Sequence, residues 1–244
     1  MTDRGTLKVG NESKRLAAAA LRGTAGLLRG DIGMLTVHHL GKSQSERIVW
    51  LCEELAIAYE LKRYARAPLL APAEYKALHP IGTAPVISDG ELTLAESGAI
   101  VQYIISKYGG GRLTLAVGHP DFAHFLYWFH FANGTLQPLM GRCMILGRLK
   151  LADDNPVLVA ARERLDRAFD FVEARTRDAA YFAGDEFTSA DIMMGFSLTT
   201  MRYFLPYDLA RLPSLRKYLR RIGARPAYQR AMEKGDPGMT LLLD

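Results

Sequence analysis

Cysteine is scarce in this sequence, with only Cys52 and Cys143 among 244 residues. They form no Cys-x-x-Cys pair and no cluster with histidine, which argues against a zinc site and against a dithiol redox centre. We therefore expect no metal and a reducing, cytoplasmic location. The sequence also lacks an uninterrupted apolar run of 18 residues, so we expect no membrane-spanning helix.

The chain also carries only a small excess of charge of one sign. The chain has 31 Lys and Arg against 26 Asp and Glu, a formal net charge of +5. Residues 1–33 contain six basic and three acidic residues, so about +2 remains for the other 211 residues. This small charge gives little support for nucleic-acid binding. The apolar content of 49% is ordinary for a globular protein, and the length suits one large or two small domains.

Residues 1–33 differ in composition from the rest of the chain. The part from Lys14 to Arg29 is rich in Ala, Leu and Arg, which is typical of an amphipathic helix or a transit-type leader. A second interpretation, which we favour, is an N-terminal extension, disordered or helical, ahead of a working start at Met34.

From residue 34 onward the pattern predicts a small α/β domain. The first predicted elements are a strand over 34–40, a helix over 45–57, a strand over 59–65 and a short helix over 73–78. Asp89-Gly90 between two apolar runs then predicts a hairpin with a type I′ turn. A helix opened by Glu96-Ser97 completes a β-α-β-α-β-β-α order, and we assign this domain to residues 34–112.

After a linker that ends near Pro120 the pattern is helical throughout, and we assign residues 119–244 to an all-helical domain. Asn155 before a proline predicts a capped helix start. Thr188 followed by Asp191 resembles a capping box with Asp in place of the usual Glu, so we expect Asp191 to be structural. The helix that begins there is predicted to continue to Tyr203. The chain is thus predicted to consist of an α/β domain followed by an all-α domain.

Several short motifs connect this architecture with a known family. The strongest are Gly82-Thr83-Ala84-Pro85-Val86 before the hairpin, Glu96-Ser97-Gly98-Ala99-Ile100 at a helix start, and Thr188-Ser189-Ala190-Asp191-Ile192 in the helical half. Together with the patterns Ser43-x-Ser45-x-Arg47 and Arg225-Pro226-Ala227-Tyr228, they make residues 34–234 resemble a cytosolic glutathione S-transferase of the bacterial or fungal branch. The resemblance implies a thioredoxin-like N-terminal domain, glutathione as co-substrate and a homodimer.

The resemblance places the activating serine of the family at Ser43, between the first strand and the first helix. A free thiol has a pKa of about 8.5 and is only slightly ionised at neutral pH. A hydroxyl group that donates a hydrogen bond to sulfur beside a helix N-terminus favours the thiolate. Ser45 is the alternative activating residue, although its simpler interpretation is the N-cap of the helix, and His39 is a remote candidate.

The resemblance also implies which residues bind glutathione. Pro85 is expected to follow a cis peptide bond, so that the backbone of Ala84 pairs with the cysteinyl part of glutathione; the alternative is that Pro85 only begins an edge strand. Glu96 and Ser97 are expected to hold the ammonium and carboxylate groups of the γ-glutamyl end, unless Ser97 is an ordinary N-cap. Thr83 completes the predicted set, but it stands where relatives often have Lys and brings no charge to the glycine carboxylate.

The aromatic residues after Pro120 suggest an apolar pocket, with Trp128, Phe131 and Met140 as candidate lining residues; a role in the core is the alternative for each. We therefore expect a glutathione transferase that conjugates the thiolate to a hydrophobic electrophile held between the domains. A non-catalytic glutathione-binding or adaptor protein with the same fold is the alternative function. A thiol reductase is disfavoured because no cysteine lies near Ser43.

Overall fold

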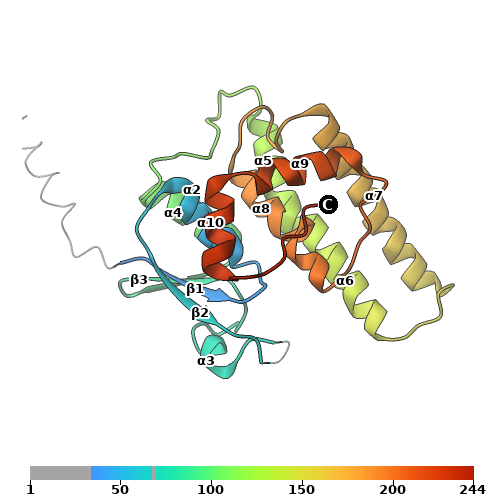
Figure 1. The fold of residues 1–244 in the computed structure, drawn as a ribbon, viewed down its shortest axis with the longest axis horizontal. Coiled ribbons are helices and arrows are strands. Elements are labelled where there is room, and N and C mark those ends of the chain that lie inside the picture. Colours follow the sequence, from blue (N-terminus) through green and yellow to red (C-terminus); the bar gives the residue numbers. More distant parts are fainter. Residues whose placement is uncertain (1–33, 68–69) are drawn as a thin grey trace, which may run out of the picture.

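The computed structural model of this protein describes residues 34–67 and 70–244. Both interpretations of residues 1–33 fall outside the described residues. In the described chain, a four-stranded sheet with its helices is followed by a domain made only of helices (Figure 1). This confirms the predicted fold class, an α/β thioredoxin-like domain followed by an all-α domain.

The strands of the N-terminal domain follow the order β2-β1-β3-β4 across the sheet. They are β1 (Thr36–Leu40), β2 (Glu60–Tyr64), β3 (Val86–Asp89) and β4 (Leu92–Ala95). The domain has three helices, α2 (Glu46–Leu55), α3 (Ala73–Lys76) and α4 (Ser97–Lys107). β1 runs parallel to β2, so the chain must cross over between them, and it does so through α2.

Both faces of the sheet are covered. α2 and α4 lie on one side of the sheet and α3 on the other (Figure 1). β1 is therefore buried along its whole length. Its C-terminal end meets the N-terminus of α2, and the loop that joins them, residues 41–45, lies at this edge of the sheet.

The β3–β4 hairpin has a different turn from the predicted one. Asp89 pairs with Leu92 in the ladder, so the two loop residues are Gly90 and Glu91. Of these, only Gly90 has a positive φ, 60°, which is the pattern of a type II′ turn and not of type I′. Asp89 stays in the strand because its buried carboxylate accepts hydrogen bonds from two side chains of α4, at 2.6 and 2.7 Å.

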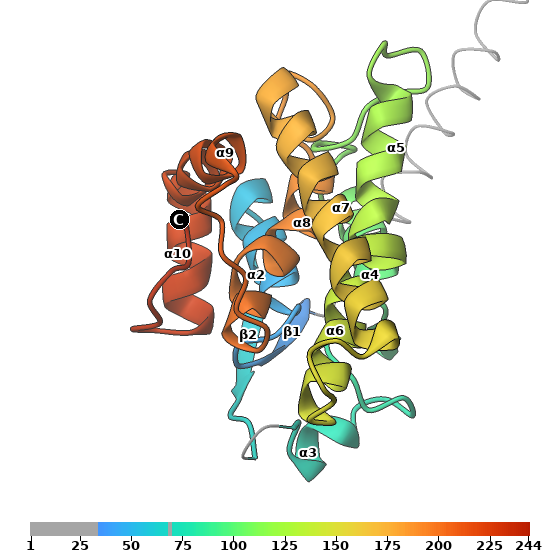
Figure 2. The same cartoon turned by 90° about the vertical axis from the view of Figure 1, so that its right-hand side faces the viewer.

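The C-terminal domain begins with a long helix. It consists of α5 (Phe122–Phe131), a π-helical turn (Ala132–Leu136) and α6 (Gln137–Arg148). The later helices are α7 (Pro156–Asp178), α8 (Ser189–Leu198), α9 (Pro213–Gly223) and α10 (Pro226–Gly235). α7 packs along α6 (Figure 2).

α8 is shorter than predicted. We expected this helix to continue to Tyr203, but it ends at Leu198. Thr199, with φ −119° and ψ −94°, departs from helical geometry, and a 3₁₀ turn (Thr200–Tyr203) follows. The expected continuation is therefore wrong.

The predicted helix caps are confirmed. The Asn155 side chain accepts hydrogen bonds from two backbone N–H groups at the start of α7. Thr188 and Asp191 form the capping box of α8. Asp191 is fully buried and also accepts the N–H of Phe182 at 2.9 Å and the hydroxyl of Tyr218 at 3.0 Å. Asp191 therefore joins three segments of the helical domain.

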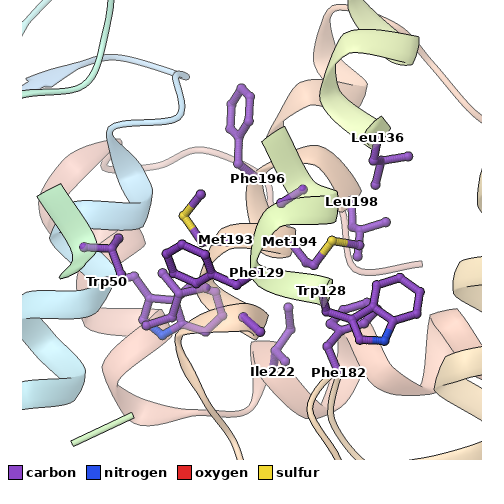
Figure 3. Close-up of a cluster of buried hydrophobic side chains, with 14 of the residues drawn as sticks. Trp50, Trp128, Phe129, Leu136, Phe182, Met193, Met194, Phe196, Leu198 and Ile222 are labelled. Atoms are coloured by element: carbon purple, nitrogen blue, oxygen red, sulfur yellow. The ribbon is translucent and has the colours of Figure 1, made fainter. Parts of the chain in front are cut away.

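An apolar core runs through both domains. Trp50 of α2 is 2% exposed, and its ring centroid lies 4.8 Å from that of Tyr228 in α10 and 5.5 Å from that of Phe187. Figure 3 shows Trp50 in the same buried cluster as Met193 and Ile222 of the helical domain. The two domains consequently share one core at α2.

Ion pairs add to the contact between α2 and α10. Arg225 bonds Glu54 at 2.6 Å, and Glu53 accepts bonds from Arg230 at 2.9 Å and from Lys234 at 2.5 Å. Both glutamate side chains are only 8% exposed. The C-terminal helix is therefore held on the N-terminal domain by charge as well as by apolar packing.

The described residues contain neither a membrane-spanning helix nor a cluster of metal-binding side chains. No helix within residues 34–67 and 70–244 is long and apolar enough to cross a membrane. The same residues contain no group of three or more His, Cys, Asp or Glu side chains that could hold a metal ion.

Replacing Asp191 with Ala should lower the free energy of unfolding by about 3 kcal/mol, because it leaves buried N–H and O–H donors without an acceptor. The matched control is Asn155→Ala, which removes another cap whose donors can reach water, and should cost about 1 kcal/mol. Urea unfolding monitored by circular dichroism measures both. Equal losses in the two variants would contradict the structural role given to Asp191.

Candidate functional site

Ser43 lies in the loop between β1 and α2 and is 4% exposed. Its hydroxyl oxygen is 2.7 Å from that of Ser45 and accepts the Ser45 N–H at 3.2 Å. Hydrogen bonds between its own serines thus hold the loop. Ser43 stands just before the N-terminus of α2, where the helix dipole favours a negative charge.

Ser45 does not act as a side-chain cap. It occupies the N-cap position of α2, but its hydroxyl accepts no hydrogen bond from the backbone of the helix. Instead, the hydroxyl oxygen accepts the N–H of Leu40 at 3.1 Å and lies 3.0 Å from Nδ1 of His39. Ser45 is thus the N-cap residue of α2, as its simpler interpretation holds, but its side chain bonds back to β1 and does not cap the helix.

Pro85 follows a cis peptide bond after Ala84, as predicted. β3, which begins directly after it, lies between β1 and β4, so the edge-strand interpretation of Pro85 is wrong. The carbonyl oxygen of Ala84 accepts a hydrogen bond from Nε2 of Gln44 at 2.8 Å. Gln44 therefore connects the Ser43 loop with the proline-led hairpin.

α4 begins at an unusual backbone conformation. Glu96 has φ 71° and ψ 109°, and such strained positions cost roughly 1–3 kcal/mol and cluster at binding sites. Glu96, and not Ser97, occupies the N-cap position, so the N-cap interpretation of Ser97 is wrong. Glu96 is exposed, whereas Ser97 is 2% exposed. This strain supports a binding role for the helix start.

Ser97 contacts Arg47, which is fully buried. Nη1 of Arg47 donates to the Ser97 hydroxyl oxygen at 3.2 Å and to the side-chain oxygen of Asn133 at 2.9 Å. The Asn133 amide also donates to the same Ser97 oxygen, at 2.8 Å. Because this oxygen already accepts two hydrogen bonds, the proton of Ser97 remains to be donated to another acceptor.

The other partners of Arg47 are neutral oxygens as well. They are the amide oxygens of Gln44 at 2.9 Å and of Gln137 at 3.0 Å. None of the ion pairs in the described part of the chain involves Arg47. Burial lowers the pKa of the guanidinium to about 9, since the charge is taken out of water without a neutralising partner. An anion near Ser97 would supply the missing negative charge.

Glu46, beside Arg47 in the sequence, does not supply it. Burial raises the pKa of the Glu46 carboxyl group to about 8, so the group is protonated at neutral pH. One of its oxygens has no hydrogen-bond partner within the described chain. The dipole of α2 and the charge of Arg47 therefore remain available to attract an anion.

Part of this network was not predicted from the sequence. Arg47 was expected only as part of a motif, and Gln44, Asn133 and Gln137 were not expected at the site. The available signal was two amide side chains four residues apart, Asn133 and Gln137, in a helix otherwise rich in aromatic residues. Asn133 belongs to the π-helical turn, and such turns occur frequently at functional sites.

The remaining predicted residues do not join this network. Thr83 is exposed in the loop before Pro85. Trp128 and Met140 are 2% and 0% exposed, and Figure 3 shows Trp128 beside Phe182, at a ring-centroid distance of 4.9 Å. This burial favours the core alternative for both residues. Phe131 lines a different cavity, of about 330 Å³, between the long helix and α7.

An open cavity of about 490 Å³ adjoins the Ser43 loop. It lies between the C-terminal ends of β1 and β2 and the segment that follows α10. Its wall includes His39, Lys42, Tyr64 and Asp236. It brings solvent to the side of His39 that faces the C-terminal segment.

Comparisons with known proteins cover both domains. The family model described as glutathione S-transferase, N-terminal domain, matches residues 34–106, and the one described as glutathione S-transferase, C-terminal domain, matches residues 121–226. The chain is similar to Glutathione S-transferase 3 of Schizosaccharomyces pombe, with 30% identity over 230 residues that cover 86% of this chain and 92% of the relative. Glutathione S-transferase 1 of Saccharomyces cerevisiae is 28% identical over 225 residues, which cover 82% of this chain and 95% of the relative.

Solved structures agree with these sequence matches. A glutathione S-transferase from Actinobacillus pleuropneumoniae superposes with a TM-score of 0.76 and is 32% identical, covering 83% of this chain and 93% of its own. The theta class glutathione S-transferase from Xanthomonas axonopodis pv. citri, solved with glutathione bound, gives a TM-score of 0.64 and 26% identity, over 82% of this chain and 97% of its own.

The buried Glu46 should make stability depend on pH. Its pKa in the folded protein, about 8, lies above the ordinary value of 4.5. Folding therefore keeps a proton that the unfolded chain has already released, so stability falls as pH rises from 4.5 to 8, by up to about 1.4 kcal/mol per pH unit. Glu46→Gln, which mimics the protonated group, should remove the contribution of Glu46 to this loss of stability with rising pH.

Urea unfolding at pH 6, 7 and 8 tests this prediction. The stability of Glu46→Gln relative to the unsubstituted protein should rise at each step. The control is Glu91→Gln at the exposed hairpin loop, which should follow the unsubstituted protein at every pH. A constant difference between Glu46→Gln and the unsubstituted protein would contradict the burial argument.

Proposed function

This chain belongs to the glutathione S-transferase family, and on that basis we propose that it conjugates the thiolate of glutathione to a hydrophobic electrophile. Membership makes the chain an enzyme of the glutathione transferase type. Glutathione bound in the Xanthomonas axonopodis relative supports glutathione as the co-substrate. The two free, buried cysteines support the proposal that it works in the reducing environment of the cytoplasm.

The observation that carries the proposal is one hydrogen-bond network joining three separate parts of the N-terminal domain. Gln44, next to Ser43, donates to the Ala84 carbonyl and accepts from Arg47. Arg47 in turn donates to Ser97. The loop, the proline-led hairpin and the start of α4 are thereby linked through two side chains. A tripeptide needs such a surface, with separate groups for its thiol, its backbone and its charged ends.

We assign thiol activation to Ser43. To lower the thiol pKa by about two units, the protein must favour the thiolate by nearly 3 kcal/mol. A hydrogen bond to a charged group contributes about 1.5–3 kcal/mol, and a helix N-terminus about 0.3–1 kcal/mol. Ser43 directly before α2 therefore provides stabilisation of the required size.

We assign the γ-glutamyl end of glutathione to the start of α4. The free proton of Ser97 and the unpaired N–H groups of the first turn suit a carboxylate, and the buried charge of Arg47 attracts it. The exposed carboxylate of Glu96 suits the ammonium group. Ala84 would pair with the cysteinyl backbone, next to Pro85. Thr83 lies where the glycine end would reach and supplies no charge.

Replacing Ser43 with Ala should lower kcat/KM for an aryl halide by roughly tenfold to a hundredfold, because the thiolate loses a charge-assisted hydrogen bond. Binding of glutathione, measured by calorimetry, should change little. The control is Ser43→Thr, which keeps a hydroxyl group and should retain most of the activity.

Two results would contradict this assignment. An unchanged rate for Ser43→Ala would exclude thiol activation by Ser43. If the unsubstituted protein binds glutathione but conjugates no electrophile in a broad panel, the non-catalytic binding or adaptor function would replace the proposed one.

We further propose that the protein is a homodimer, assembled through an exposed aromatic patch. The patch consists of the exposed rings of Tyr127 and Phe171 and the partly exposed Leu139, which lie over the buried Phe131 on the long helix and α7. Tyr127 is 50% exposed and Phe171 47%, which is unusual for large aromatic side chains. Arg164 and Arg167 border the patch, and an aromatic centre with an arginine-containing rim is typical of protein–protein interfaces.

Phe171→Glu should convert the dimer into a monomer, because it places a charge in the centre of the interface. Sedimentation equilibrium should give twice the chain mass of 27.1 kDa for the unsubstituted protein and the single chain mass for the variant. The control is Val117→Glu, in which an 82% exposed apolar residue outside the patch receives the same charge. A Phe171→Glu variant that remains dimeric would refute this interface.

A further inference from the structure

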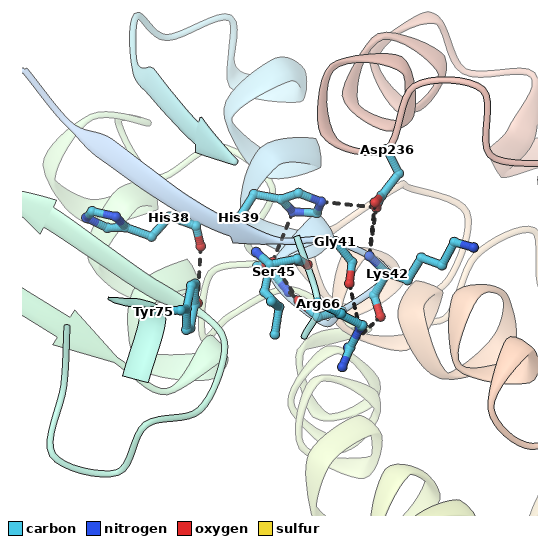
Figure 4. Close-up of polar contacts among 10 residues, drawn as sticks. His38, His39, Gly41, Lys42, Ser45, Arg66, Tyr75 and Asp236 are labelled. Carbon is cyan, nitrogen blue, oxygen red and sulfur yellow. Dashed lines mark hydrogen bonds and ion pairs between the residues drawn. The ribbon is translucent and has the colours of Figure 1, made fainter. Parts of the chain in front are cut away.

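Ser43 stands at one end of a buried chain of hydrogen bonds that ends at the C-terminal segment. Its hydroxyl is 2.7 Å from that of Ser45, which lies 3.0 Å from Nδ1 of His39. Nε2 of His39 lies 3.0 Å from a carboxylate oxygen of Asp236, 197 residues further along the chain. Figure 4 shows the His39 ring between Ser45 and Asp236. Ser45 and His39 are both 0% exposed.

The direction of these hydrogen bonds follows from which groups carry protons. The carboxylate of Asp236 can only accept, so Nε2 of His39 carries a proton. In the neutral ring Nδ1 is then an acceptor, and the Ser45 hydroxyl donates to it. The Ser45 oxygen accepts the N–H of Leu40 and the hydroxyl of Ser43. In this state the only proton of Ser43 points to Ser45 and cannot bond a ligand.

A proton on Nδ1 reverses the bonds between His39, Ser45 and Ser43, whereas Nε2–H donates to Asp236 in both states. Nδ1–H then donates to Ser45, the Ser45 hydroxyl donates to the Ser43 oxygen, and the proton of Ser43 is free for a ligand. The carbonyl of Leu40, at 3.3 Å from the Ser45 oxygen, is a more distant acceptor than Ser43. All hydrogen-bonding positions of Ser45 are filled in both states. The protonation of His39 thus decides where the hydrogen bond of Ser43 is directed.

We propose that His39, held by Asp236, receives the proton of the glutathione thiol through Ser43 and Ser45. The S–H bond breaks as its proton passes to the Ser43 oxygen, the Ser43 proton passes to Ser45, and the Ser45 proton passes to Nδ1. The products are a thiolate and an imidazolium ion, with no net change in charge. The new Ser43 hydroxyl points back at the sulfur and stabilises the thiolate just formed.

The far end of the chain offers a route for the proton to leave. His39 and Asp236 both line the open cavity of about 490 Å³ beside the loop. Water in this cavity can take the Nε2 proton of the imidazolium after conjugation, which leaves a neutral ring with its proton on Nδ1. The starting tautomer returns when water passes a proton to Nε2 and the Nδ1 proton leaves through Ser45 and Ser43, so that one proton in total reaches the solvent.

Gly235 and Asp236, at the end of α10 and just after it, lie close to the His39 ring. A Cβ atom on Gly235 would lie 3.1 Å from Nε2 of His39, so glycine allows the end of α10 to approach the ring closely. Asp236 also accepts the Lys42 N–H with both carboxylate oxygens, at 3.0 and 3.1 Å. The same carboxylate therefore fixes the imidazole ring and the loop that carries Ser43.

Among the charged groups around His39, Asp236 is the counter-ion of the protonated ring. Glu46, whose charge would act on Asp236, is protonated at neutral pH because burial raises its pKa to about 8. Arg66 lies close enough for its charge to interact with Asp236, and it donates hydrogen bonds to the carbonyls of Gly41 and Lys42. Arg63, on the neighbouring strand, pairs with His39 in the sheet. The Lys42 ammonium is directed to the ring of Tyr203, at 4.9 Å.

Ser45, His39 and Asp236 are positioning residues in this account, which rests on the proposed function of Ser43. The test measures the pKa of the thiol of bound glutathione from the ultraviolet absorbance of the thiolate as a function of pH. The variant is His39→Asn, whose amide oxygen can accept from Ser45 but cannot take up a proton. The control is His38→Asn: His38 is also buried and twice hydrogen-bonded, to Tyr64 and Ser88.

His39→Asn should raise the pKa of the bound thiol by about one unit, equivalent to a tenfold loss of thiolate at neutral pH. kcat/KM should fall by the same factor at neutral pH and recover at alkaline pH, where the thiol ionises without help. Glutathione affinity should stay near that of the unsubstituted protein. Asp236→Asn should shift the pKa in the same direction, and His38→Asn should leave it unchanged.

A thiol pKa unchanged in His39→Asn, while Ser43→Ala raises it, would refute the relay and leave the proposed function intact. If Ser43→Ala also leaves the thiol pKa unchanged, the assignment of Ser43 fails and the relay fails with it. Should His39→Asn not fold, Asp236→Asn decides the question, because Asp236 lies at the cavity wall. An unchanged pKa in that variant would equally overturn the proposal.

Discussion

The contact between α10 and α2 is the interaction on which the geometry of this protein depends. Trp50 and Tyr228 give it an apolar centre, and three ion pairs to the glutamates of α2 lie at its edge. Breaking such partly buried pairs one partner at a time is costly, so the helix has little freedom to move. Because Asp236 directly follows α10, this contact also sets the position of the Ser43 loop, whose backbone Asp236 holds.

A second constraint is the uncompensated charge of Arg47. Burying a cation costs several kcal/mol unless a partner offsets it, and the hydrogen-bond partners of the guanidinium within the described residues are neutral oxygens. These oxygens come from both domains, so the charge orients the N-terminal domain relative to the long helix. A bound carboxylate would complete this set of partners. We therefore interpret the buried charge of Arg47 as part of a binding site for an anionic ligand. Binding of the anion would offset the free-energy cost of burying the guanidinium.

The sequence allowed the architecture to be predicted because the relevant signals are local. Helical spacing, the Asn155 and Thr188 caps and the glycine at the hairpin each act within a few residues. The partners of the site side chains could not be predicted in this way. Asp236 meets His39 across 197 residues and Asn133 meets Arg47 across 86, and both contacts exist only once the helices have packed. The partners of the Ser45 hydroxyl were not predicted either, because they lie in the preceding strand and not in the helix that Ser45 begins.

The central claim is that the Ser43 loop, the Ala84 backbone and the start of α4 form a single glutathione site. A crystal structure of the glutathione complex tests it most directly. We expect the sulfur within hydrogen-bonding distance of the Ser43 hydroxyl, the cysteinyl backbone paired with Ala84 and the γ-glutamyl carboxylate on Ser97. Glutathione bound elsewhere, or with its sulfur directed to another residue, would contradict the account.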